Sequence, residues 1–206
     1  ETGPDGDSAD LAWRVKDAPL TVYASCCIDR ERQLLSWSWR LLARRNTPRI
    51  GQVEVADLWL EHGDDAPDYT LRGITGGRLP EKHEDGSLFP PTCLKPWEEQ
   101  IGAFKNFELD SDGCGKSSSS QIPIWLYYGP DGGTWFGPEY SGWWHKDIGR
   151  MPGHTELHVS LPALDFRMLQ GEEVEMPGFS MAAWDGSLRD GHNHLRRTIR
   201  DLYMGT

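Results

Sequence analysis

The sequence predicts a mainly β protein, an antiparallel β-sandwich that ends in one α-helix. Three observations lead to this fold class. The 206 residues include 23 Gly and 14 Pro, which divide the chain into many short segments. Apolar and polar residues alternate with a period of two between residues 20 and 74, as in strands with one solvated face. Apolar residues at the C-terminal end follow helical spacing, which predicts one helix there. Together, the three observations predict roughly nine to twelve short strands and one helix.

The first clear elements are two strands, at residues 20–28 and 33–44, joined by the charged turn 29–32. One face of the second strand carries large apolar side chains: Leu35, Trp37, Trp39 and Leu41. Residues 50–60 and 69–74 also alternate cleanly, and we expect these two segments to be antiparallel neighbours.

The alternation fails in residues 76–112, which contain several prolines and scattered charges. Pro80, Pro90, Pro91 and Pro96 interrupt this segment. A long irregular segment is unusual in a compact domain and more often serves a function than links two elements. We therefore expect an irregular functional excursion over residues 76–112.

Regular structure returns with two aromatic-rich runs, residues 121–128 and 134–145. Asp131-Gly132 lies between them, and Asp-Gly between two such runs predicts a β-hairpin. Because neighbours on a strand face opposite ways, we expect either Trp143 or Trp144, but not both, in the core. Further strands are expected near residues 156–161, 166–168 and 173–183.

The last segment is a predicted helix that begins near Ser187. Its apolar stripe consists of Leu188, Leu195, Ile199 and Leu202. We therefore divide the chain into a sandwich domain, 1–186, and a linker helix, 187–206. This helix either packs on the strands before it or leads into a further domain. The first eight residues contain neither Met nor an apolar signal segment, so we expect the natural chain to have had residues upstream.

Charge and cysteine content limit the partners and leave the compartment open. The formal net charge of −11 repels phosphate backbones and anionic lipid, so we expect neither nucleic acid nor a membrane as partner. The longest apolar run, residues 122–128, is much shorter than the roughly 20 residues of a membrane span. A Cys93–Cys114 disulfide and free thiols both remain open, and the sequence agrees with a secreted or a cytoplasmic protein.

Motifs for metal binding are incomplete, and we expect no metal and no cofactor. Asp110-Ser111-Asp112-Gly113 begins like a calcium loop, but Gln121 stands where the closing Glu should be. His154, Glu156 and His158 alternate on a strand, so they share one face, the minimum geometry for a metal site or an acid/base pair. We interpret that face as an ordinary solvated strand surface.

Motifs for catalysis are also incomplete. Ser141-Gly142 lacks the preceding Gly of a nucleophile elbow, and Gly132-Gly133 lacks the Lys-Ser/Thr of a P-loop. A carboxylate pair of the glycosidase kind is a remaining alternative. Its strand-borne candidates are Glu54, Asp57, Glu139 and Asp147, and the sequence brings no two of them together.

The C-terminal half resembles a known family. Its segments Gly115–Ser118, Ile122–Trp125 and Gly132–Trp144 look like the amino-terminal β-supersandwich of α-galactosidase-like glycoside hydrolases (family thirty-six, clan D). In the Trp-Ser-Gly-x-Trp type strand of that family, Tyr140 here stands for the first Trp. The closing segments, Gly171–Glu173, Asp185–Leu188 and His194–Asp201, are similar to the family's linker helix. The resemblance covers about residues 110–206.

The resemblance implies a module that is not catalytic by itself. The family's catalytic residues lie on a (β/α)₈ barrel, which needs roughly 250 residues of its own. We therefore expect an N-terminal sandwich that supports carbohydrate binding and assembly of a barrel in the same or a partner chain. The expected carbohydrate-binding residues are Trp97, Trp135, Trp144 and Glu139.

Two alternatives stay open at this point. One is a stand-alone, lectin-like carbohydrate-binding module. The other is a complete small β-sandwich glycosidase that uses Glu139 with Glu54 or Asp57. The sugar, its linkage and homo-oligomer formation are likewise undetermined by the sequence.

Overall fold

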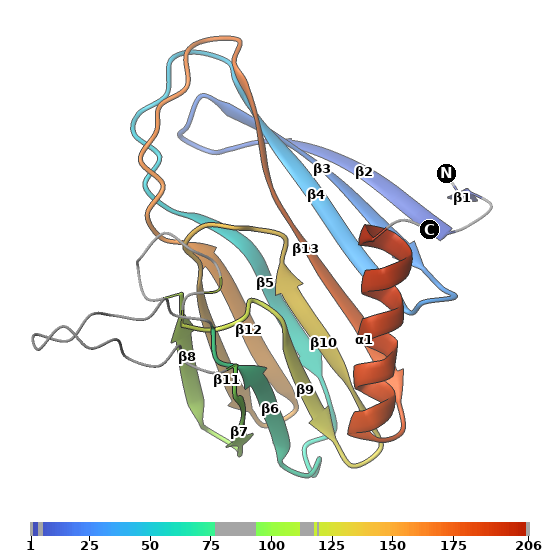
Figure 1. The fold of residues 1–206 in the computed structure, drawn as a ribbon. Helices are drawn as coiled ribbons and strands as arrows, with labels where there is room; N and C mark the ends of the chain where they lie inside the picture. Colours follow the sequence, from blue (N-terminus) through green and yellow to red (C-terminus); the bar gives the residue numbers. More distant parts are fainter. Residues whose placement is uncertain (1, 4–5, 77–93, 112–117, 119, 205–206) are drawn as a thin grey trace, which may run out of the picture.

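The computed structural model describes residues 2–3, 6–76, 94–111, 118 and 120–204, which form two stacked antiparallel sheets and one helix (Figure 1). The strand order of the large sheet is β1-β2-β3-β4-β13-β10-β9-β6-β7, and that of the small sheet is β5-β12-β11-β8. The predicted β-sandwich with a C-terminal helix is therefore confirmed. None of the described helical residues belongs to a helix long and apolar enough to cross a bilayer.

The large sheet contains β1 (Thr2–Gly3), β2 (Gly6–Arg14), β3 (Leu20–Asp29), β4 (Leu34–Ala43), β6 (Tyr69–Ile74), β7 (Pro96–Ile101), β9 (Trp125–Gly129), β10 (Gly132–Pro138) and β13 (Glu173–Asp185). The small sheet contains β5 (Val53–Glu61), β8 (Asn106–Asp110), β11 (His145–Met151) and β12 (His154–Leu161). The helix is α1 (Leu188–Tyr203), which packs on β10 and β13.

The main core lies between the two sheets because each contributes one apolar face. In the small sheet, Leu157 and Val159 of β12 alternate with outward polar side chains and are fully buried. Trp125, Phe136 and Phe179 of the large sheet meet them from the other side. A second cluster under α1 consists of Leu34, Leu126, Trp135, Ala182 and Trp184, with Leu188 and Leu195 of the helix packed against it.

Both predicted hairpins are present. β3 and β4 pair from Leu20↔Ala43 to Asp29↔Leu34. β9 and β10 meet at Gly129↔Gly132, as the Asp131-Gly132 signal predicts. Gly132 has a φ of +154°, and a Cβ there would lie 2.3 Å from the carbonyl oxygen of Trp184, so this turn requires glycine.

The expectation that residues 50–60 and 69–74 are antiparallel neighbours is wrong. The first segment forms β5, which pairs with β12 in the small sheet. The second forms β6, which pairs with β7 and β9 in the large sheet. Alternation identifies a strand with one solvent-exposed face, but it does not indicate which sheet contains that strand.

The expectation of an irregular segment over residues 76–112 is wrong for its second part, which contains β7 and β8. Pro96 is compatible with β7 because β7 is an edge strand, where a missing N–H costs no ladder hydrogen bond. In β7, Trp97 and Ile101 alternate with the exposed Glu98 and Gln100. Residues 77–93 lie outside the described residues. Cys93 and Cys114 also lie outside them, so the structure does not address a disulfide between the two.

Two further strand expectations need correction. The run 134–145 is divided, because β10 ends at Pro138 and an unpredicted strand, β11, begins at His145. Residues 166–168 form only an isolated bridge, Phe166 to Ile50. The expectation for the adjacent tryptophans is confirmed: Trp144 is fully buried, whereas Trp143 is only half-buried.

Candidate functional site

An apolar cavity of about 370 Å³ lies beneath α1, between the helix and the outer face of β10 and β13. Its lining consists of Pro123, Ile124, Trp135, Gly137, Pro138, Glu139, Ser180, Leu195 and Ile199. Two of the four predicted carbohydrate-binding residues, Trp135 and Glu139, therefore meet at one place. Pockets that hold small ligands are commonly of this size and combine apolar walls with a few polar groups.

The Trp135 ring is packed in the cluster under the helix and is only 4 % exposed. Its Nε1 donates a hydrogen bond to Nδ1 of His194, at 3.0 Å, while His194 Nε2 lies 2.8 Å from the carbonyl oxygen of Arg32. Because Nδ1 accepts, Nε2 carries the proton and donates to that carbonyl. This chain of hydrogen bonds holds the indole edge in place and joins β10 to the helix.

Glu139 follows β10 and is an exposed polar group on the cavity wall. Its Oε1 accepts a hydrogen bond from Ser180 Oγ at 2.6 Å, and its backbone N–H donates to the Gly178 carbonyl at 2.9 Å. These contacts orient the carboxylate, and a carboxylate oxygen is an acceptor suited to sugar hydroxyls.

The other two predicted binding residues lie elsewhere. Trp97, on edge strand β7, has its ring against Gly73 of β6 and donates from Nε1 to Gln121 Oε1 at 2.5 Å. Trp144 is in the main core, in edge contact with Trp125 at a centroid separation of 4.7 Å. The structure thus brings neither residue to the cavity, and their contact with sugar stays a prediction.

The carboxylates of the small-glycosidase alternative are in separate sheets. Glu54 and Asp57 belong to β5 in the small sheet, whereas Glu139 follows β10 in the large sheet. Oδ1 of Asp57 lies 3.1 Å from Nδ1 of His158, while Glu139 is held by Ser180. Asp57 and Glu139 therefore each have a different polar partner in this structure.

A second polar surface lies on the outer face of the small sheet. His154, Glu156 and His158 do share this face, as their alternation predicts, and His154 Nε2 lies 3.3 Å from Glu156 Oε1. Trp59 of β5, which is not among the residues predicted from the sequence, is 68 % exposed and stacks on the His154 ring at 4.8 Å. The sequence does indicate that Trp59 faces outward, because it alternates with the polar residues Asp57 and Glu61 along β5.

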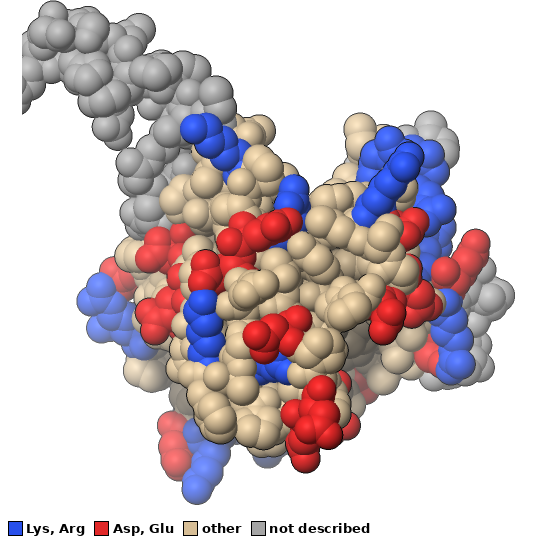
Figure 2. All heavy atoms as spheres, turned by 90° about the horizontal axis from the view of Figure 1, so that it is seen from below, with Lys and Arg blue, Asp and Glu red and all other residues tan. Residues whose placement is uncertain are grey.

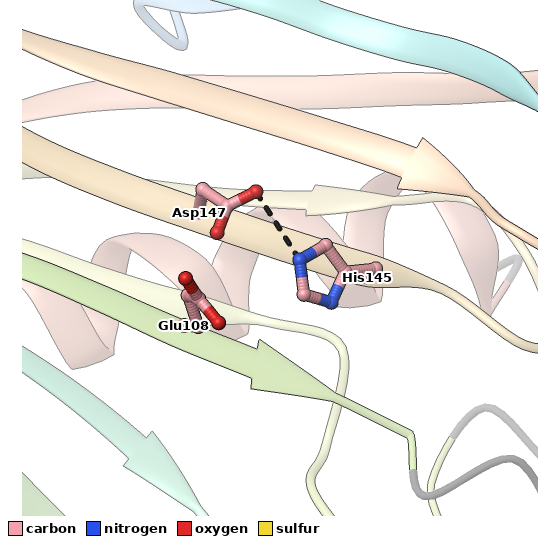
Figure 3. A group of neighbouring side chains, drawn as sticks. All are labelled: Glu108, His145 and Asp147. Carbon is pink, nitrogen blue, oxygen red and sulfur yellow. Dashed lines mark hydrogen bonds and ion pairs between the residues drawn. The ribbon is translucent and has the colours of Figure 1, made fainter.

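Three further side chains gather on this face, namely Glu108 of β8 and His145 and Asp147 of β11 (Figure 3). One potential ligand atom from each lies within 4.8 Å of the other two. His145 Nε2 and Asp147 Oδ2 are 3.2 Å apart. Of this group, only Asp147 is a candidate from the sequence, as a glycosidase carboxylate. Its neighbours could not be foreseen because the pairing Asp147↔Glu108, which brings the two carboxylates together, depends on the unpredicted strand β11.

The charge on the surface is predominantly acidic. In Figure 2, acidic and basic side chains are both scattered among uncharged residues over the face shown. The net charge of −11 favours uncharged or cationic ligands over anionic ones.

Comparisons with known proteins identify the fold. No family model matches the chain, and no curated protein matches it in sequence. Among solved structures, a variant of the GH36 α-galactosidase AgaA from Geobacillus stearothermophilus, in complex with stachyose, has a TM-score of 0.67 at 13 % identity. That match covers 98 % of this chain and 27 % of the enzyme.

Two other solved structures show the same similarity more weakly. The α-galactosidase from Lactobacillus brevis has a TM-score of 0.62 at 10 % identity, over 95 % of this chain and 29 % of that one. A GalM/aldose epimerase homologue from C. elegans has a TM-score of 0.52 at 9 % identity, over 91 % of this chain and 68 % of its own.

This chain therefore spans between a quarter and a third of the length of these α-galactosidases. At such low identity the similarity shows the fold alone. The structural neighbours include the GH36 α-galactosidases that the sequence resemblance indicates, so the chain has the fold of a β-sandwich region found in those enzymes.

Proposed function

We propose that this chain is a non-catalytic β-sandwich module of an α-galactosidase-like glycoside hydrolase. In this proposal, residues 1–186 are the module and residues 187–206 lead toward a (β/α)₈ catalytic barrel in the same or a partner chain. The observation that carries it is the match of nearly the whole chain to only about a quarter of GH36 α-galactosidases. A module of this kind supports assembly of the barrel and the binding of carbohydrate.

The end of α1 offers a surface for contact with a barrel. Leu188 and Leu195 pack on the large sheet, but Leu202 is 44 % exposed and Met204 is 73 % exposed. Burying large apolar side chains in a domain interface stabilises it by about 1.5–3 kcal/mol for each one fully buried.

The proposed carbohydrate contacts are those of the cavity beneath α1 and of edge strand β7. Trp135 and Ile199 supply apolar wall, and the Glu139 carboxylate supplies a hydrogen-bond acceptor. Trp97 offers a half-buried ring at the sheet edge. The fully enclosed Trp144 acts by packing against Trp125 beneath the surface.

One specific observation favours the stand-alone carbohydrate-binding module as a second candidate. Trp59 has an open ring supported by His154, and Asp57 and Glu156 lie on the same outer face. Aromatic rings with neighbouring hydrogen-bonding groups suit the apolar face and hydroxyl rim of a sugar. Such a surface would bind carbohydrate without a barrel.

Calorimetric titration of the 206-residue chain with stachyose tests the proposal and separates the two candidates. We expect Glu139→Gln and Trp97→Ala each to weaken binding by about 1–3 kcal/mol if they are central contacts. Glu175→Gln, which changes an exposed carboxylate elsewhere on the large sheet, should bind like the parent chain. Loss of binding in Trp59→Ala alone selects the second candidate, and absence of stachyose binding contradicts the carbohydrate contact in both.

A further inference from the structure

We propose that Glu108, His145 and Asp147 form a binding site for a divalent transition-metal ion of the Zn²⁺ class on the outer face of the small sheet. The set combines one imidazole nitrogen with two carboxylates, which suits Zn²⁺ better than Ca²⁺ or Mg²⁺, whose preferred ligands are all oxygen. It is independent of the proposed function, because no part of it depends on a sugar or a barrel.

The geometry is close to what a zinc ion needs. Ligands that bind zinc at 2.0–2.2 Å in a tetrahedron lie about 3.3 Å apart. His145 Nε2 and Asp147 Oδ2 are already 3.2 Å apart, and all three ligand atoms lie within 4.8 Å of one another. Small rotations about the side-chain bonds of Glu108 would close the set around one ion and leave at least one coordination position for water.

The backbone beneath the three side chains is rigidly placed. His145 and Asp147 are two residues apart on β11, so both point to the same side of the sheet. The residues between and after them, Lys146 and Ile148, are fully buried in the main core. Glu108 is directly opposite Asp147 in the β8–β11 pairing, which holds the two carboxylates side by side without any loop.

The charge of this face also favours a cation. The two basic residues of β5, β8, β11 and β12 are Lys146 and Arg150, and both are buried on the inner side of the small sheet. The outward positions carry Asp57, Glu156 and Asp147 in addition to Glu108. His158 faces Asp147 across the β11–β12 pairing but is engaged by Asp57, so it does not compete with the ion for Asp147.

The test is a calorimetric titration of the chelator-treated 206-residue chain with ZnCl₂, repeated with CaCl₂ and MgCl₂. We expect one zinc ion per chain at micromolar affinity, and at least about tenfold weaker binding in both His145→Ala and Asp147→Asn. Replacement of zinc by Co²⁺ should give the visible absorption of a bound ion in the parent chain and lose it in both variants.

The matched control is His192→Ala, which removes an exposed histidine from α1, on the other sheet. It should bind zinc like the parent chain. Circular dichroism shows whether each variant keeps the β-sandwich, and the partly exposed positions of the three side chains make loss of folding an unexpected result. Absence of zinc binding in the parent chain, or equal loss in His192→Ala and His145→Ala, would overturn the proposal.

Discussion

Lys146 is a lysine whose side chain lies in an apolar environment. It is fully buried in the main core, and its Nζ lies 3.6 Å from the centre of the Trp125 ring. No hydrogen-bonding partner for Nζ is present among the described residues. Burial lowers the pKa of this amine well below its usual value, because a charged ammonium loses its hydration in the core. The electron-rich faces of Trp125 and, at 5.5 Å, Phe136 provide favourable contacts for the amine.

We predict that Lys146→Met stabilises the protein. Methionine has a similar length and flexibility, and it removes a buried polar group whose lack of a partner costs about 1–3 kcal/mol. Urea unfolding at neutral pH should therefore show a free energy of unfolding higher by roughly that amount. A lower value would mean that the contact of the amine with Trp125 outweighs its desolvation.

At the scale of elements, α1 is held by a short-range cap and by close packing. Asp190 Oδ2 accepts hydrogen bonds from Ser187 N at 2.9 Å and from Ser187 Oγ at 2.6 Å. Gly191 allows the helix to approach the sheet, since a Cβ there would lie 2.4 Å from the Trp184 ring. A glycine inside a helix costs about 1 kcal/mol relative to alanine, so close packing on Trp184 is the compensating gain.

We predict that the cap makes α1 sensitive to acid. The hydrogen bonds from Ser187 hold the pKa of Asp190 below its usual value, so the folded protein favours the charged carboxylate. Its contribution to stability is present above the unfolded pKa of about 3.9 and is lost as the pH falls through the lower folded value. Relative to their intrinsic exchange rates, the first-turn amides should therefore be less protected from hydrogen exchange in acid, and Asp190→Ala should show that low protection already at pH 7. Equal exchange in both proteins at pH 7 would contradict the role of the cap.

At the scale of the whole molecule, the two sheets place the polar groups on opposite outer sides. The cavity with Glu139 lies under α1 on the outer side of the large sheet, whereas Trp59 and the Glu108, His145 and Asp147 group are on the outer side of the small sheet. The main core separates them. Sugar contact at the cavity and metal binding on the small sheet are therefore expected to respond to mutation independently.

We predict that the 206-residue chain alone hydrolyses no α-galactoside. The carboxylates considered for a glycosidase pair belong to different sheets and have other partners, Ser180 for Glu139 and His158 for Asp57. Release of a chromophore from a nitrophenyl α-galactoside should equal the buffer blank. Turnover that disappears in Glu139→Gln would contradict this prediction and restore the small-glycosidase alternative.

The candidate sites show how much could be predicted from sequence. The aromatic hairpin predicts Trp135 and Glu139 as binding residues, and the two do line one cavity. The cavity itself forms only because α1 packs over β10, and these two elements are far apart in the sequence. The Glu108, His145 and Asp147 group was not predictable, since it needs the register of β11 against β8, a strand from the segment expected to be irregular.

The sequence by itself determined the hairpins β3–β4 and β9–β10, the position of α1 and the β-sandwich class. These features depend on turn residues, capping and periodicity, all of which act between residues close in the chain. Only the tertiary structure decided that β5 pairs with β12, that Pro96 begins an edge strand and that Trp144 rather than Trp143 is enclosed. Those outcomes depend on which distant strand supplies the hydrogen-bonded partner and the facing apolar surface. The residues near each strand in the sequence do not determine that partner.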